Sequence, residues 1–255
     1  MAATIAVYDR RGRRLATVYL GQMPQAHQLT LSEELTAVLE EVLRDWQLPM
    51  PRLVYVTDGG YHPEQYFKDV LAKMPNPHAP GEILIWERVV DYYHACQYIT
   101  KLAEALFGPT PQATIWARRM RRWLKEKPKG IHRVLHSAAA IRQLRGLAGH
   151  ADDYERAYAY LSTRIDHLRY YESRQKGIPI GSGVTEAACK TIFTQRFKLS
   201  GMTWSLEGGA AILTLRVIHL SGIWNDCVAR RITLRQQPHT PAQTIKPPET
   251  LKIAA

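Results

Sequence analysis

Cysteine is scarce in this sequence: Cys96, Cys189 and Cys227 are the only three, and no two of them form a CxxC pair. This excludes a disulfide-stapled scaffold and a cysteine-ligated zinc ribbon. Long hydrophobic runs are lacking too. The longest apolar stretch, 210–222, contains Arg216 and is too short to span a bilayer, and the first residues form no apolar leader. We therefore expect a cytoplasmic protein with no membrane partner.

Acidic residues are outnumbered, with 23 Asp and Glu against 34 Lys and Arg, which gives a formal net charge of +11. A hydrophobic content of 45% over 255 residues is enough for a folded core in one or two domains. The charge favours a polyanionic partner, either nucleic acid or an acidic membrane surface. A generically basic protein without such a partner is the alternative.

The first 108 residues alternate strand and helix patterns, which is typical of an α/β fold. The chain begins with a predicted β-hairpin, because two β-branched and aromatic runs flank the turn residues Asp9 to Gly12. The elements expected here are strands at 4–8 and 14–20, a helix from Thr30 or Ser32 to about 45, a strand at 53–56, a helix at 63–74, a strand at 83–90 and a helix at 92–107.

Strand patterns disappear after residue 108, and we expect a basic helical insertion at 109–176. Within 111–149 there are ten Lys or Arg and one acid, Glu126. A stripe of Tyr and aliphatic residues at helical spacing follows in 154–168, and core packing explains it better than base stacking. Beyond a glycine-rich segment, 177–225 is predicted to hold a helix at 184–199 and a buried helix at 206–220. A loose tail is expected at 226–255.

Two acidic residues lie at positions where α/β proteins commonly carry functional side chains. Asp58 follows a predicted buried strand, and Glu186 lies in the first turn of a helix preceded by Gly181-Ser182-Gly183. Each has an ordinary structural explanation, a turn-forming Asp for the first and a helix-capping Glu for the second. As a pair they would supply hard oxygen ligands for Mg²⁺ or Mn²⁺.

Asp91 and His94 join a strand end to the first turn of the following helix, so both can project towards the same sheet edge. A catalytic carboxylate and imidazole are one interpretation. The other is a helix N-cap with a hydrogen-bonded core histidine. The sequence leaves both open.

The segment from Trp116 to Trp123 interleaves four arginines with two tryptophans seven residues apart. Phosphate pairing by Arg118, Arg119, Arg121 and Arg122, together with base stacking by the two indoles, would suit nucleic-acid binding. A helix that buries both indoles and leaves its arginines in water is the alternative.

The order of these segments resembles one known family. LVYVTDGG, then VVDYYHACQYITKLAEALFG, a helical block and GIPIGSGVTEAACKTIFTQRFKLSGMTWSLEGG resemble the DDE transposases of the ISKra group of bacterial insertion sequences, relatives of the Mutator-like transposases. The resemblance covers nearly the whole chain. It is densest at 177–222, where PIGSG, EAACK and SGMTWS follow in order.

The resemblance implies an RNase H-like core with an α-helical insertion. Asp58 would be the second catalytic acid and Glu186 the third, with Asp91 and His94 matching the C/D-x-x-H signature. Two Mg²⁺ or Mn²⁺ ions held by the acids would promote DNA strand cleavage and transfer. DNA contacts would extend to the third acid's helix, through Lys190, Arg196 and Lys198.

The sequence departs from the family at its start. The strand that carries the first acid is absent, Asp9 falls in a hairpin turn, and we do not assign that role to it. The expectation is thus a partial core, from a shortened gene or a late start codon, that is nucleoid-associated and inactive by itself. It would act as a homo-oligomer or by co-assembly with an intact transposase. The alternatives are a DNA-binding fragment that regulates such a transposase and an RNase H-like nuclease.

Overall fold

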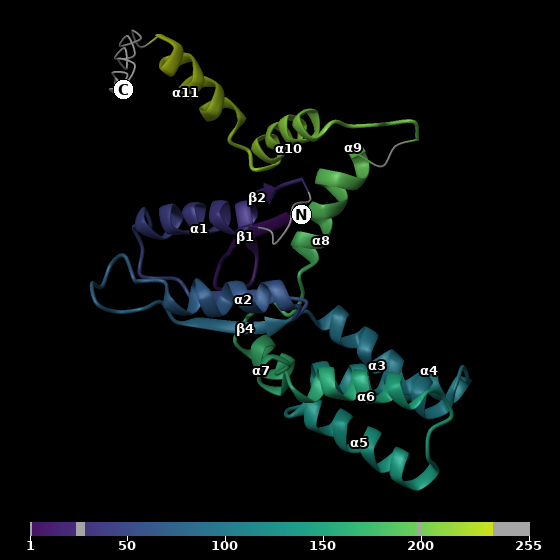
Figure 1. Cartoon of the computed structure of the whole chain (residues 1–255). Coiled ribbons are helices and arrows are strands. Elements are labelled where there is room, and N and C mark those ends of the chain that lie inside the picture. The colour runs from purple at the N-terminus through teal and green to yellow at the C-terminus, as the bar shows by residue number, and fades with distance from the viewer. Residues whose placement is uncertain (1, 24–28, 198–199, 237–255) are drawn as a thin grey trace, which may run out of the picture.

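The structure, a computed structural model, describes residues 2–23, 29–197 and 200–236. It is a mixed α/β arrangement that is mostly helical. The described part contains two separate two-stranded sheets, β1–β2 and β3–β4. In Figure 1 the hairpin and α1 lie on one side of α2 and β4, while α3, α4, α5 and α6 gather at the other end of the molecule.

The predicted hairpin is confirmed. Strands β1 (Ala2–Tyr8) and β2 (Arg14–Gly21) pair antiparallel, with a shift in register between Val7 and Tyr8. Asp9 closes the turn, since its Oδ1 accepts hydrogen bonds from the backbone N–H groups of Arg11 and Arg13. Asp9 is therefore a turn residue.

The second sheet joins β3 (Leu53–Thr57) in parallel to β4 (Trp86–Val90). Between them run α2 (Tyr61–Asp69) and a 3₁₀ turn, η2 (Leu71–Lys73), where we expected one helix to residue 74. The strand expected at 83–90 is shorter, because Ile83 makes only an isolated bridge with Pro75. Helix α1 (Leu29–Arg44) packs against both sheets through a shared apolar cluster.

The two sheets approach one another without pairing. The carbonyl of Lys176 accepts a hydrogen bond from Arg52, just before β3, and a Cβ at Gly12 in the hairpin turn would lie 4.0 Å from the carbonyl oxygen of Gly177. The turn after β1 and the residue before β3 therefore both lie beside 176–177. No residue of β1 or β3 is fully buried, although both strands are largely apolar.

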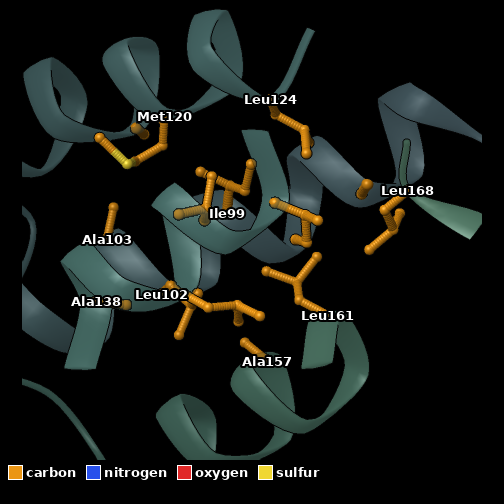
Figure 2. Packing of buried hydrophobic residues seen from close by; sticks show 14 of the residues in the cluster. Ile99, Leu102, Ala103, Met120, Leu124, Ala138, Ala157, Leu161 and Leu168 are labelled. Carbon is orange, nitrogen blue, oxygen red and sulfur yellow. The ribbon is translucent and has the colours of Figure 1, made fainter. Parts of the chain in front are cut away.

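Helix α3 and the predicted helical insertion share one apolar core. Its elements are α3 (Tyr92–Phe107), α4 (Pro111–Glu126), α5 (Gly130–Arg145), α6 (Ala151–Ser162), a 3₁₀ turn η3 (Ile165–His167) and α7 (Tyr170–Gln175). Figure 2 shows Ile99, Leu102, Met120, Leu124 and Leu161 from three of these helices pointing towards one another. The stripe at 154–168 belongs to this core, as predicted.

The C-terminal helices differ most from expectation. The helix expected at 184–199 is divided into α8 (Gly183–Cys189), a π-helical turn η4 (Lys190–Thr194) and α9 (Gln195–Phe197). Helix α10 (Leu206–Leu220) forms as predicted but is not buried: only Gly209 and Leu213 are, and Leu206 is 70% exposed. One face of α10 packs against β2 and η4 through Leu213 and Val217, while Leu206 and Leu215 remain exposed.

Residues 226–236 were expected to begin a loose tail, but they belong to a helix, α11 (Trp224–Gln236), which extends away from the rest in Figure 1. Residues 237–255 of that expected tail lie outside the described part. Among the described helices none is by itself long and apolar enough to cross a membrane. Only α10 together with 224–233 reaches that length and composition, and this pair is bent by 117°.

Candidate functional site at the ends of β3 and β4

Asp91 is buried, at 2% exposure, and joins three segments of the chain. Its backbone N–H donates to the carbonyl of Thr57 at the end of β3 (2.7 Å). One carboxylate oxygen accepts from the N–H of His94 (2.8 Å), which caps α3, and the other accepts from the N–H and the hydroxyl of Ser182 (2.8 Å for the hydroxyl). Asp91 thereby fixes the approach to α8 against the ends of both strands.

The N-cap interpretation of Asp91 is therefore the one that the geometry supports. Three protein donors engage the Asp91 carboxylate, two on one oxygen and one on the other. Asp91 is thus a helix N-cap that positions the start of α8, and the catalytic role expected of it stays a prediction.

Asp58 stands on the exposed loop directly after β3. Its Oδ1 accepts from the N–H of Gly60 (2.8 Å), as a turn-forming Asp does, while Oδ2 has no partner among the described residues. The loop is held from the helical insertion: the Tyr160 hydroxyl donates to the carbonyl of Asp58 (2.6 Å), and Arg164 donates to that of Gly59 (3.0 Å). The turn interpretation is confirmed, and it leaves one oxygen available.

Glu186 is exposed in the first turn of α8. Two residues just before Glu186 are anchored. Ser182 hydrogen-bonds to Asp91, and the Thr185 hydroxyl lies 2.8 Å from that of Thr4 on β1. No hydrogen bond or ion pair engages the Glu186 carboxylate within the described residues. Its helix start adjoins the strand ends that carry Asp58, since Asp91 contacts both.

A complete metal site is not formed by the described residues, in which no three His, Cys, Asp or Glu side chains come together as a ligand group. With Asp91 engaged elsewhere, Asp58 and Glu186 are the carboxylates that fit a hard divalent cation.

His94 lies beside an aromatic pair and not on a carboxylate. Its ring meets the rings of Tyr98 (5.4 Å between centroids, 69°) and Tyr160 (5.7 Å, 68°) edge to face. No hydrogen bond to the imidazole occurs in the part of the chain that the structure describes. The structure thus brings His94 close to the Asp58 loop through Tyr160.

The basic helix α4 lies beside Tyr92, the residue that follows Asp91. The Tyr92 hydroxyl donates to the carbonyl of Arg121 (3.1 Å), and the Lys125 ammonium lies 5.5 Å from the Tyr92 ring centre. A cavity of about 400 Å³ opens there, lined by Arg118, Arg122 and Lys125 and also by Glu126, which pairs with Arg122 (3.0 Å). We call these three cations the α4 basic face.

Three of the α4 residues that were predicted to bind DNA make contacts within the protein instead. Trp116 is 7% exposed and its indole N–H donates to Ser137 (2.9 Å), so it is a core residue and offers no ring face to a base. Trp123 packs against the same core. Arg121 is half-buried and donates to Thr100 on α3. The alternative of buried indoles with arginines in water therefore holds for Trp116 and for Arg118, Arg119 and Arg122, which are exposed, but Trp123 is only partly buried.

The cations predicted beyond Glu186 are separated. Lys190 is exposed in the π-helical turn, and Arg196 lies 5.5 Å above the ring of Trp204. Lys198 lies outside the described residues.

Sequence reasoning missed Tyr98, Lys101, Tyr160 and Arg164. Tyr160 falls between the stripe positions of α6, so periodicity gave no reason to select it. A signal existed on α3, where His94, Tyr98 and Lys101 recur at helical spacing. Burial raises the pKa of Tyr160, against the opposing influence of Arg164, so its hydroxyl remains a hydrogen-bond donor at neutral pH.

Comparisons of this chain with protein-family models, with curated proteins and with solved structures found no match.

Replacing Asp91 by Ala is expected to lower the free energy of unfolding by about 2–4 kcal/mol, because the part-buried N–H groups of His94 and Ser182 would lose the acceptor that the buried carboxylate provides. Denaturant unfolding measures this. Asp9→Ala is the matched control, because Asp9 also accepts two backbone N–H bonds but at an exposed turn, where water can replace it. Equal losses for the two variants would contradict the positioning role of Asp91.

Proposed function

We propose that this chain is a DNA-binding part of a DDE-type transposase with an RNase H-like core. Asp58 and Glu186 would be two of its divalent-metal ligands, for Mg²⁺ or Mn²⁺. The bound metal would activate water or a 3′-hydroxyl and stabilise the leaving oxygen in strand cleavage and transfer. The chain's own residues bind and orient the DNA: the α4 basic face contacts phosphates, and Asp91 holds the start of α8 beside the strand ends.

The observation that carries this proposal is the Asp91 junction. It connects the end of β3, the start of α3 and the loop before α8, and these segments bear Asp58, Tyr92 and Glu186. Exposed carboxylates and an adjoining basic face are the combination that metal-dependent chemistry on a polyanion requires. The resemblance of motif order described above supports the same conclusion.

A DNA-binding fragment that regulates an intact transposase by co-assembly is the second candidate. It is favoured by the occupied carboxylate of Asp91, which leaves Asp58 and Glu186 without a third acid among the described residues. Both candidates require DNA binding. They differ in whether Asp58 and Glu186 hold a metal.

The test combines binding of a labelled DNA duplex, measured by fluorescence anisotropy, with binding of Mn²⁺, measured by its electron paramagnetic resonance signal in the presence of DNA. We expect DNA binding without cleavage. We also expect Asp58→Asn and Glu186→Gln each to weaken Mn²⁺ binding by about tenfold or more, because removal of a direct ligand costs at least as much as loss of its supporting hydrogen bonds.

Asp69→Asn is the control, since it removes an equally exposed carboxylate from α2, paired only with Lys73. Absence of DNA binding would overturn the proposed function. DNA binding with Mn²⁺ affinity unchanged by Asp58→Asn and Glu186→Gln would remove the metal assignment and favour the regulatory fragment.

A further inference from the structure

A second cavity, of about 660 Å³, lies between α3 and α6, two helices that pack side by side in Figure 1. Tyr98, Lys101, Arg156, Tyr160 and Arg164 are on its lining. We call it the α3–α6 pocket. It carries more cations than carboxylates, with Asp153 as its acid.

The centre of the pocket is a stack of two rings and two cations. The rings of Tyr98 and Tyr160 are parallel within 3°, with centroids 3.6 Å apart. The Arg164 guanidinium lies 4.2 Å from the Tyr160 centroid, and the Lys101 ammonium lies 4.8 Å from that of Tyr98. Since each ring covers one face of the other, the cations occupy the outer faces.

The two cations differ in how firmly they are held. Arg164 donates to the carbonyls of Gly59 and Tyr160, and a Cβ at Gly59 would lie only 2.9 Å from its Nε, so it is fixed on the Asp58 loop. Lys101 is exposed, and within the described residues its ammonium interacts only with the ring of Tyr98. The outer face of Tyr98 can therefore be vacated by rotation of one flexible side chain.

The chemistry of the pocket suits a nucleotide that is not base-paired. An aromatic face accepts a base by stacking, and Lys101 can neutralise the phosphate beside it, together with Arg156 once it exchanges its exposed ion pair with Asp153 (2.9 Å) for the phosphate. The volume is within the range of small-molecule sites. A base held in a duplex is already stacked on both sides and cannot use the face of Tyr98.

We infer that the α3–α6 pocket binds an unpaired nucleotide of the DNA strand that passes Asp58, stacking its base on Tyr98 and pairing its phosphate with Lys101 and Arg156. This inference rests on the proposed function and names a subsite of it. The Tyr160 and Arg164 bonds to the Asp58 loop hold this pocket next to Asp58.

The experiment compares two labelled DNAs by anisotropy: a blunt duplex and the same duplex with a short single-stranded overhang. The full chain should bind the overhang DNA about tenfold more tightly, as expected for one stacked base. The double variant Lys101→Gln and Arg156→Gln should lose most of this preference while keeping its affinity for the blunt duplex. Tyr98→Leu should likewise lose the preference for the overhang DNA. The control variant Arg145→Gln, at an exposed site on α5, should retain it.

Because Lys101 and Arg156 are exposed, their replacement leaves the core intact even if Tyr98→Leu does not fold. Equal affinity of the full chain for the two DNAs, or a preference unchanged in the double variant, would overturn the subsite while leaving duplex binding and the proposed function standing. Failure to bind either DNA would overturn both.

Discussion

Replacing the α4 basic face, Arg118, Arg122 and Lys125, by Gln should weaken duplex binding by about 500-fold at 0.1 M salt. The estimate follows from counterion release, in which each phosphate contact contributes about 0.9 to the slope of log affinity against log salt, so three lost contacts reduce the slope by about 2.7. Titrations of a labelled duplex at several salt concentrations measure both quantities.

A control variant that removes three cations elsewhere distinguishes the effect of total charge from the effect of position on α4. Arg119, Arg133 and Arg145 are exposed on α4 and α5, but none is on the lining of the Tyr92 cavity. Their triple Gln variant should keep most of the affinity. If it loses as much as the variant of the basic face, binding depends on overall charge and the α4 surface is not the DNA contact. Arg121 is left unchanged in both variants because it donates to Thr100 and supports the packing of α4 on α3.

A strand added ahead of β1, with an Asp in the Val-Asp-Gly arrangement that the family resemblance implies, should join the two sheets. Strands β1 and β3 belong to different sheets and are only partly buried along their whole lengths. An inserted strand would pair with both and bury apolar surface on each face. Two core-facing side chains at about 1.5 kcal/mol each correspond to a gain of about 3 kcal/mol in the free energy of unfolding.

The same addition should produce Mg²⁺- or Mn²⁺-dependent strand cleavage, because it would bring a third carboxylate to Asp58 and Glu186. Cleavage of a labelled duplex and denaturant unfolding are the two measurements. An added strand with Asn in place of its Asp is the matched control, and it should give the stability without the cleavage. Asp58→Asn or Glu186→Gln in the extended protein should likewise abolish cleavage and keep the gain in stability.

Two outcomes would contradict this expectation. If the extended protein is no more stable than the original chain, the strand does not fill the space between β1 and β3. If it cleaves equally well with Asp58→Asn, the acids have been assigned wrongly.

The sequence by itself determined the local elements of this protein. The hairpin, helix 92–107 and the helical insertion follow from short-range patterns, because turn residues, caps and apolar periodicity act within a few positions of one another. The net charge and its concentration in 111–149 are likewise properties of composition. The core stripe of α6 was predictable for the same reason, since a 3.6-residue period specifies one face of a helix.

Only the tertiary structure decided which interpretation of each polar residue holds. Asp91 is a positioning residue because Ser182, 91 positions away, supplies its donors. Trp116 is a core residue because Ser137 on α5 meets its indole. The pairing of Tyr98 with Tyr160 joins two helices whose separate patterns show no relation. The exposure of α10 depends on what packs against it, which its own composition does not specify. Contacts between distant segments depend on how the elements pack, and a pattern within one segment carries no information about its neighbour in space.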